Sequence, residues 1–157
     1  MTLENPLSQI HPRKIGPEGV TLRGAVPASC FDLPVTDRLS SKDDLVYNLF
    51  LSMVSHGLLV QGDVSIVLRC RCDRCLTYYD YALNIKELCY YYKEIKEDVI
   101  DLTEDIREDI LLNFPQQLLC NPDCRGLCPR CGQNLNVRSC GCEAGNGGGV
   151  WDVLDKL

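Results

Sequence analysis

Residues 45–70 have the sequence LVYNLFLSMVSHGLLVQGDVSIVLRC, in which apolar side chains recur at every second position. They occupy each odd-numbered position from Leu45 to Met53, with Asn48 and Ser52 among the residues between them, and mostly even-numbered positions from Val60 to Cys70. A period of two is typical of β-strands that bury one face. His56 and Gly57 lie between the two runs and supply a turn. The stretch therefore predicts two long antiparallel strands.

The alternation resumes downstream over Thr77–Ile85, which predicts a third strand. Consecutive strands joined by short turns favour an antiparallel meander with one buried and one solvated face. Upstream, residues 1–44 show no long periodicity and are interrupted by prolines. Only short strands are expected there, at Val20–Arg23 and Ala25–Ser29.

A helix is predicted at about residues 102–114. Asp101, with Glu104 three residues later, resembles a capping box, in which two side chains satisfy the first free amides of a helix. Apolar residues then recur at helical spacing as far as Phe114, and Pro115 ends the pattern.

These elements predict an α+β fold, an antiparallel β-meander with one main helix and a cysteine-rich, zinc-binding carboxy-terminal segment. We expect residues 1–114 to form the β-rich domain and residues 115–144 to pack on it as the zinc segment. Residues 145–157 begin with a glycine-rich run, which predicts a linker followed by a short docking helix.

Six cysteines fall within 23 residues near the carboxyl end, spaced Cys120-x3-Cys124-x3-Cys128-x2-Cys131-x8-Cys140-x-Cys142. Thiolates at such spacings are how short, loop-rich segments hold zinc. The chain has eleven cysteines in all, an odd number that does not suit a fully paired disulfide framework. The first residues contain no apolar run typical of a secretory signal, so we expect the reducing cytoplasm, where thiols persist.

The spacing alone leaves the ligand set open. We favour Cys128, Cys131, Cys140 and Cys142, with Cys124 and then Cys120 in reserve. A second Cys-x2-Cys turn, Cys72 with Cys75, brings the total to eight thiols, enough for two tetrahedral sites. Alternatively, this turn completes one site with the Cys128 turn and leaves the other four to a weaker site. We predict one zinc ion, or two. The isolated cysteines are expected in the core, namely Cys30, Cys70 and Cys89.

Charge is distributed unevenly along the chain. The net charge is −6, which disfavours binding of nucleic acid through bulk electrostatics. The stretch 94–109 is strongly acidic, whereas arginines gather beside the cysteines. Four of them are candidate contacts for RNA or a protein partner, namely Arg71, Arg74, Arg125 and Arg130. The same arginines could instead balance the formal charge of −2 on a zinc ion held by four thiolates.

The sequence gives no sign of a catalytic centre. A catalytic zinc needs an open coordination position and usually a nearby histidine or glutamate, and the cysteine-rich segment offers only Glu143 and no histidine. We therefore expect a closed structural site, with no enzymatic activity and no small-molecule substrate. No run of about 18 apolar residues is present, so no membrane contact is expected.

The cysteine-rich segment and its surroundings resemble the YceD family. The resemblance rests on LCNPDCRGLCPRCG at 119–132, NLN at 134–136 and CGC at 140–142, together with CDRCL at 72–76. Further similar positions are Ile100-Asp101-Leu102, Arg107-Glu108, Pro115 and Trp151-x2-Leu154. One departure is the short link Lys93–Ile100, where the family commonly carries a longer acidic insertion.

The resemblance implies a non-enzymatic role in the accumulation of 23S ribosomal RNA and the biogenesis of the large ribosomal subunit. A zinc-stabilised surface would bind large-subunit rRNA, a basic ribosomal protein, or both. The alternative is a protein-only adaptor or chaperone for a basic ribosomal protein, with structural zinc and no RNA contact.

Overall fold

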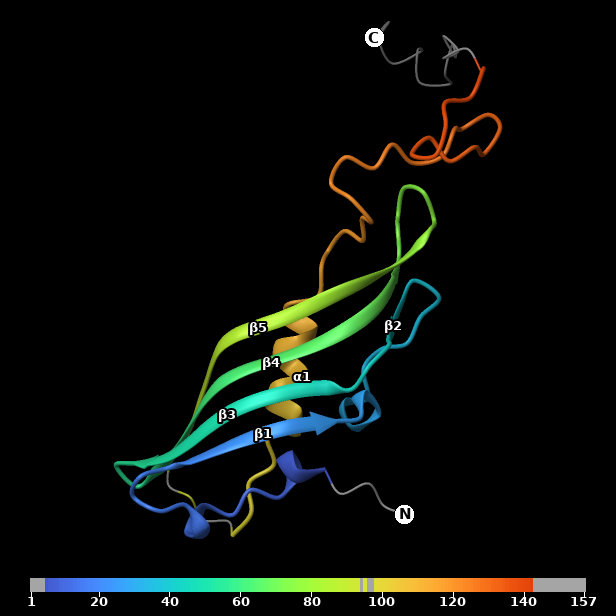
Figure 1. Ribbon diagram of the computed structural model, residues 1–157. Coiled ribbons are helices and arrows are strands. Elements are labelled where there is room, and N and C mark those ends of the chain that lie inside the picture. The colour runs from blue at the N-terminus through green and yellow to red at the C-terminus, as the bar shows by residue number, and fades with distance from the viewer. Residues whose placement is uncertain (1–4, 94, 96–97, 143–157) are drawn as a thin grey trace, which may run out of the picture.

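The structure is a computed structural model that describes residues 5–93, 95 and 98–142 (Figure 1). Three short 3-10 helices, five strands and one α-helix follow each other as η1 (Pro6–Ser8), η2 (Pro12–Lys14), β1 (Val20–Val26), η3 (Ala28–Phe31), β2 (Leu39–Ser41), β3 (Leu45–Val54), β4 (Gly57–Arg71), β5 (Tyr78–Tyr92) and α1 (Thr103–Leu112). The predicted α+β class, an antiparallel sheet with one main helix, is confirmed.

All strands belong to one antiparallel sheet built around β4. Along one edge, β4 pairs with β3 over residues 57–65 and with β2 over residues 68–70. Along the other edge it pairs with β5, and β1 extends the sheet beyond β3. Because β4 and β5 both run past the end of β3, their connecting hairpin projects from the body of the sheet, next to the cysteine-rich segment (Figure 1).

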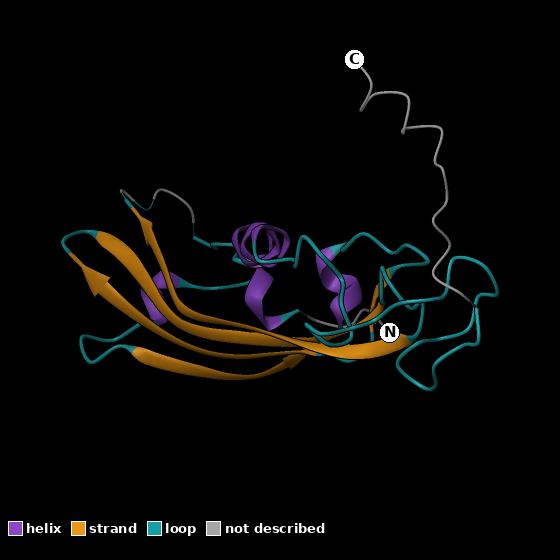
Figure 2. Ribbon diagram, turned by 90° about the horizontal axis from the view of Figure 1, so that it is seen from above, coloured by secondary structure: helices purple, strands orange, loops and turns teal. Residues whose placement is uncertain are grey.

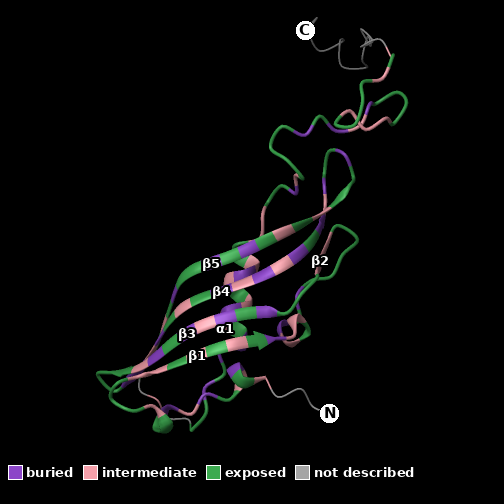
Figure 3. Ribbon diagram, viewed as in Figure 1, coloured by how far each residue is buried: buried purple, intermediate pink, exposed green. Residues whose placement is uncertain are grey.

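The predicted meander β3-β4-β5 is present, and so is its alternation of buried and exposed side chains (Figure 3). On β3, Leu45, Leu49 and Leu51 are at most 1% exposed. Ser55 and His56 form the turn to β4, both with positive φ. A two-residue hairpin loop of this kind matches the natural twist of the two strands it joins.

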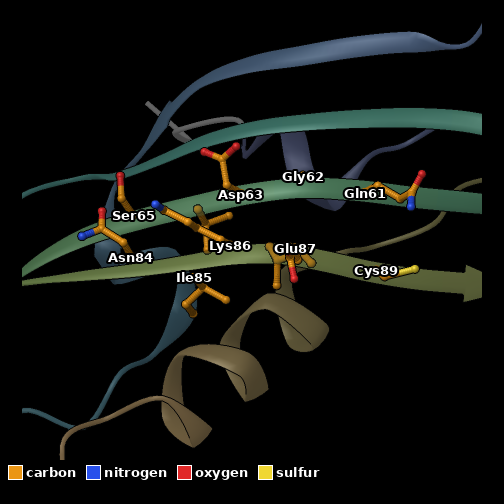
Figure 4. Close-up of a pocket in the computed structure, with 11 residues that line it drawn as sticks. Gln61, Gly62, Asp63, Ser65, Asn84, Ile85, Lys86, Glu87 and Cys89 are labelled. Atoms are coloured by element: carbon orange, nitrogen blue, oxygen red, sulfur yellow. The ribbon is translucent and has the colours of Figure 1, made fainter.

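A β-bulge changes the register of the sheet between β4 and β5. Gly62 pairs with Leu88 and Val64 with Ile85, so two residues of β5 stand opposite one of β4. The extra residue moves the buried side chains of β5 from odd to even positions. Figure 4 shows Ile85 directed toward the helix below the sheet, with polar side chains around an open depression at the bulge.

Helix α1 covers the buried face of the sheet (Figure 2). Ile106 and Ile110 are fully buried in the core, and the phenols of Tyr90 and Tyr92 donate hydrogen bonds to aspartates on the helix. The helix is shorter than the predicted 102–114. At its start the Asp101 carboxylate accepts from the Thr103 amide at 2.8 Å, which satisfies one of the first free amides.

Two expectations from the sequence were wrong, and one short strand was missed. The two short strands expected at 20–29 are one strand, β1, followed by η3. Strand β2 was not predicted, because three residues show no periodicity. Cys89 is exposed rather than in the core, because the bulge turns its neighbour Leu88 inward. Cys70 is buried as expected, and Cys30 is half-buried against the core.

The amino-terminal segment ties the link before α1 to the rest of the domain. Ile10 pairs with Ile100, and the Leu102 amide donates to the Leu7 carbonyl at 2.9 Å. None of the helices in the described residues is long and apolar enough to cross a membrane. The predicted docking helix at 145–157 lies outside the described residues.

Candidate metal centre

Eight of the eleven cysteines form two separate groups of four. Within each group the four sulfur atoms lie within 4.8 Å of one another. We call Cys72, Cys75, Cys120 and Cys124 the first cluster, and Cys128, Cys131, Cys140 and Cys142 the second cluster.

The first cluster joins the sheet to the cysteine-rich segment. Cys72 and Cys75 come from the β4–β5 hairpin, and Cys120 and Cys124 come from the chain that follows α1. Three of the four side chains are at most 5% exposed and form a small core of their own, with only Cys120 exposed. Tyr79, Leu119 and Leu127 pack against that core.

Asp73, between the two hairpin cysteines, binds the backbone of the segment that precedes Cys120. Its amide donates to the Leu118 carbonyl at 2.7 Å, and its carboxylate accepts from the Leu118 amide at 3.0 Å and from Arg38 at 2.5 Å. Hydrogen bonding from Leu118 and the adjacent guanidinium lower the pKa of this carboxyl. Arg74 adds a bond to the Cys124 carbonyl at 3.0 Å. The polar contacts of one turn therefore fix where Cys120 and Cys124 lie.

The sulfur spacing in the first cluster suits a tetrahedral metal ion. A zinc–sulfur bond of about 2.3 Å implies tetrahedral sulfur–sulfur distances of about 3.8 Å. Cys72 and Cys124 are 3.8 Å apart at sulfur, and Cys75 and Cys120 are 3.5 Å apart. Both distances far exceed the roughly 2.05 Å of a disulfide, and all eleven cysteines are free.

The second cluster lies on loops farther from the sheet (Figure 1). Cys128 is 6% exposed, whereas Cys131 is exposed and the remaining two are half-buried. The turn is closed by the Gly132 amide, which donates to the Cys128 carbonyl at 2.9 Å. Gly132 has a φ of 72°, a left-handed conformation that favours glycine. The sequence thus closes the turn locally, without help from the sheet.

Backbone amides prepare one thiolate in each cluster. Burial opposes ionisation of Cys72, but backbone hydrogen bonds, first from Cys120, lower the pKa of this thiol to about 6. Hydrogen bonds from the Cys131 and Arg130 amides lower the pKa of Cys128 to about 6. Cys120 is exposed as a residue, but desolvation of its sulfur and hydrogen bonding with Cys75 raise the pKa of this thiol to about 12. Hydrogen bonding with Cys131 raises the pKa of Cys142 to about 12. Four thiolates at these distances need a cation among them.

The structure groups the four cysteines that we favoured as ligands into the second cluster. The two reserve cysteines, Cys124 and Cys120, belong instead to the first cluster with Cys72 and Cys75. The alternative in which the Cys72 turn shares a site with the Cys128 turn is wrong, because these turns lie in different clusters. Metal binding by either cluster stays a prediction.

The four candidate contact arginines differ in what they touch. Arg71 forms an ion pair with Asp37 at 3.0 Å, and Arg74 donates to the Cys124 carbonyl. Arg125 and Arg130 are exposed, and neither side chain has an ion-pair partner among the described residues. Arg125 and Arg130 are therefore the better placed of the four to meet a partner.

Residues 90–157, which include both Cys120–Cys124 and the whole second cluster, match the sequence profile of the family described as large ribosomal RNA subunit accumulation protein YceD. Plant relatives carry the same name. This part of the chain, residues 90–157, belongs to the YceD family. The hairpin that completes the first cluster, with Cys72 and Cys75, lies outside the matched residues.

Two groups of relatives resemble this chain over part of its length. It is 31% identical over 103 residues to an uncharacterized protein of Mycobacterium tuberculosis (strain ATCC 25618 / H37Rv), covering 56% of this chain and 50% of the relative. It is 46% identical over 48 residues to a chloroplastic YCED homolog 1 of Zea mays, covering 30% and 16%, and 33% identical over 63 residues to that of Arabidopsis thaliana, covering 40% and 19%. The chain therefore spans half the length of the mycobacterial relative, and less than a fifth of the length of each plant relative. No solved structure matches it.

Proposed function

We propose that this chain is a non-enzymatic factor in the accumulation of large-subunit ribosomal RNA, and that two structural zinc ions hold its contact surface in shape. Large-subunit rRNA is the proposed partner, with or without a basic ribosomal protein, and the cytoplasm is the expected compartment. The observation that carries the proposal is the position of the clusters. Both include cysteines from the segment that matches the YceD profile, beside exposed arginines.

The chemistry of the clusters supports a structural rather than a catalytic metal. Each offers four thiols, which fill the tetrahedral positions of zinc and leave none for water or substrate. Among the described residues no histidine lies in either cluster. The residues themselves would bind the ion, exclude water from the first cluster and hold the loops between the ligands in one conformation.

The surface argument rests on charge. Residues 118–142 contain three arginines and a single acidic residue, Asp123, and within the described part of the chain none of the three arginines is in an ion pair. Phosphate contacts from such side chains position a protein on RNA without reading its sequence. The acidic helix α1 lies apart from this surface, on the sheet (Figure 1).

Binding to fragments of large-subunit rRNA at several salt concentrations tests the proposal. We expect affinity to fall as salt rises. Arg125→Glu should weaken binding and reduce the logarithmic salt slope by about 0.7–0.9 for each phosphate that the variant no longer neutralises. Lys14→Glu is the control, because Lys14 is exposed, is in no ion pair among the described residues, and lies in η2, at the opposite end of the molecule (Figure 1). Equal effects of the two changes would contradict a contact at Arg125.

A protein-only adaptor is the second candidate, and one observation favours it. Arg71 and Arg74 are already engaged within the protein, and the charge of two zinc–thiolate centres would offset the remaining arginines. The exposed acidic side chains of α1, Glu104 and Glu108, would then hold a basic ribosomal protein. Absence of RNA binding at low salt, with binding of a basic ribosomal protein abolished in Glu104→Lys/Glu108→Lys, would establish this alternative instead.

A further inference from the structure

One side chain links the loop of the second cluster to a cysteine of the first. Asn136 lies in the loop between Cys131 and Cys140, two residues of the second cluster, and its amide nitrogen donates a hydrogen bond to the Cys124 sulfur of the first cluster at 3.2 Å. The loop that connects two ligands of one centre is therefore attached to a ligand of the other.

The orientation of the Asn136 amide is fixed by its other partners. Its oxygen accepts from the backbone amide of Arg125 at 2.8 Å, and a backbone amide can only donate. Its nitrogen also donates to the side-chain oxygen of Asn134 at 2.9 Å. Reversing the amide would break all three hydrogen bonds, so the nitrogen faces the Cys124 sulfur.

Other residues of the same loop form hydrogen bonds with the segment after the first cluster and with the β4–β5 hairpin. The Leu135 amide donates to the Gly126 carbonyl at 2.9 Å, and Asn134 reaches the Thr77 hydroxyl at 3.4 Å. Gly126 has a φ of 73°, and a Cβ there would lie 3.1 Å from the Arg74 carbonyl oxygen. The turn between the clusters is thus packed closely against the hairpin that carries Cys72 and Cys75.

We propose that Asn136 couples the two clusters, so that metal binding at the first cluster strengthens metal binding at the second. This inference rests on the proposal that both clusters bind metal. A metal ion keeps Cys124 as a thiolate, and a charged acceptor makes a stronger hydrogen bond with the Asn136 amide. The fixed amide then holds the loop whose ends carry Cys131 and Cys140, so less ordering remains when the second ion binds.

The expected size of the coupling follows from residues that hydrogen-bond to metal ligands elsewhere. Removal of such a partner typically lowers metal affinity about 10–100-fold. Because coupling between two binding equilibria is reciprocal, filling the second cluster must strengthen the first by the same factor. Asn136 is a positioning residue in this scheme, because its side chain contacts the ligand Cys124 and would not contact either metal ion.

The variant Asn136→Asp tests the proposal with little change in shape. It keeps an oxygen for the Arg125 amide but places a second oxygen where the nitrogen donated to Cys124. Asn121→Asp is the matched control, because Asn121 also lies near the first cluster and uses only its oxygen, which accepts from the Asp123 amide at 2.9 Å. Both variants add the same charge.

Zinc affinity is measured by competition with a chromophoric chelator, and the two sites are distinguished by cadmium-113 NMR after replacement with Cd²⁺. We expect Asn136→Asp to weaken the first cluster about 10-fold or more, because its ligand Cys124 loses a hydrogen bond, and to weaken the second cluster through the lost coupling. The cadmium resonance of the first cluster should also move. We expect Asn121→Asp to have none of these effects. Circular dichroism of the sheet checks that both variants fold.

A double-mutant cycle that combines Cys120→Ser with Asn136→Asp provides an independent test. Cys120 is the exposed ligand of the first cluster, so its replacement disables that centre with little disturbance of the core. The second cluster should become about 10-fold weaker for zinc, and adding Asn136→Asp should cost little more. Fully additive effects, or equal effects of Asn136→Asp and Asn121→Asp, would overturn the coupling while leaving the metal centres intact. Absence of any zinc binding by the unmodified chain would instead overturn the metal centres themselves.

Discussion

The two cysteine clusters offer the same four sulfur ligands but have very different surroundings. The first has three buried cysteines, two of them on a hairpin of the sheet, and a small apolar core of its own. The second has one buried cysteine, and all its ligands lie within 15 residues of loop, Cys128–Cys142. The surroundings therefore favour a different role for each cluster. We propose that a metal ion in the first cluster attaches the cysteine-rich segment to the domain, and that one in the second holds the shape of that segment.

Removing a ligand of the first cluster should have the largest effect. We expect Cys75→Ser to lower zinc affinity of the first cluster by more than the roughly 100-fold seen for outer partners of a ligand, and to release the segment around Leu118 from the hairpin. Cys89→Ser is the control, because Cys89 is exposed and belongs to neither cluster. Hydrogen exchange at residues 71–78 and 118–124 measures the release. Unchanged protection there would mean that the first cluster does not hold the two parts together.

The corresponding change in the second cluster should stay local. Cys140→Ser is expected to reduce the zinc content by one ion per chain and to change the free energy of unfolding of the sheet by less than about 0.5 kcal/mol. The reason is that all its cysteines lie in the loops after α1, whereas two cysteines of the first cluster lie in the β4–β5 hairpin of the sheet. Elemental analysis and urea unfolding followed at α1 and the sheet check both parts. A large decrease in the free energy of unfolding of the sheet would contradict this, because the second cluster would then support the sheet as the first does.

Burial should also set the order in which thiols react. During slow removal of metal by a chelator, we expect iodoacetamide to modify Cys131 and its half-buried neighbours before Cys72, Cys75 and Cys124, as followed by mass spectrometry of peptides. Exposed Cys120 should be the earliest of the first cluster to react. Simultaneous modification of all eight cysteines would indicate that the clusters open together.

The smallest effect is expected at Asp73, which positions the first cluster without binding metal. Asp73→Asn keeps an oxygen for the Leu118 amide but removes the charge that pairs with Arg38. We expect a decrease in zinc affinity of about 10-fold or less. Asp80→Asn is the matched control. Like Asp73, Asp80 forms ion pairs, here with Lys42 and Arg69, but it lies in β5, outside both clusters. Zinc competition should detect no change in that control.

The sheet could be predicted from the sequence because its strands bury one face, which imposes a period of two on residues 45–54 and 57–71. The bulge could not. It depends on Gly62, where a Cβ would lie 2.1 Å from the Asn48 carbonyl oxygen, and on Glu87 with a positive φ, and neither leaves a periodic signal. The prediction that Cys89 lies in the core was wrong for that reason.

The candidate site was predictable as eight thiols but not as two sets of four. The spacing within 128–142 favours one set, because the turn at Cys128–Cys131 closes locally. The other set depends on a contact between Asp73 and Leu118, which are 45 residues apart. Such a contact is made by the fold and not by local spacing, so Cys120 and Cys124 could not be assigned to Cys72 and Cys75 beforehand.

The most direct test of two four-thiolate centres is the metal content of the chain purified under reducing conditions, measured by native mass spectrometry with elemental analysis. We expect two zinc ions per chain, falling to one in Cys140→Ser and to one in Cys120→Ser. A single ion that survives both substitutions, or a chain free of metal with its cysteines in disulfides, would contradict it.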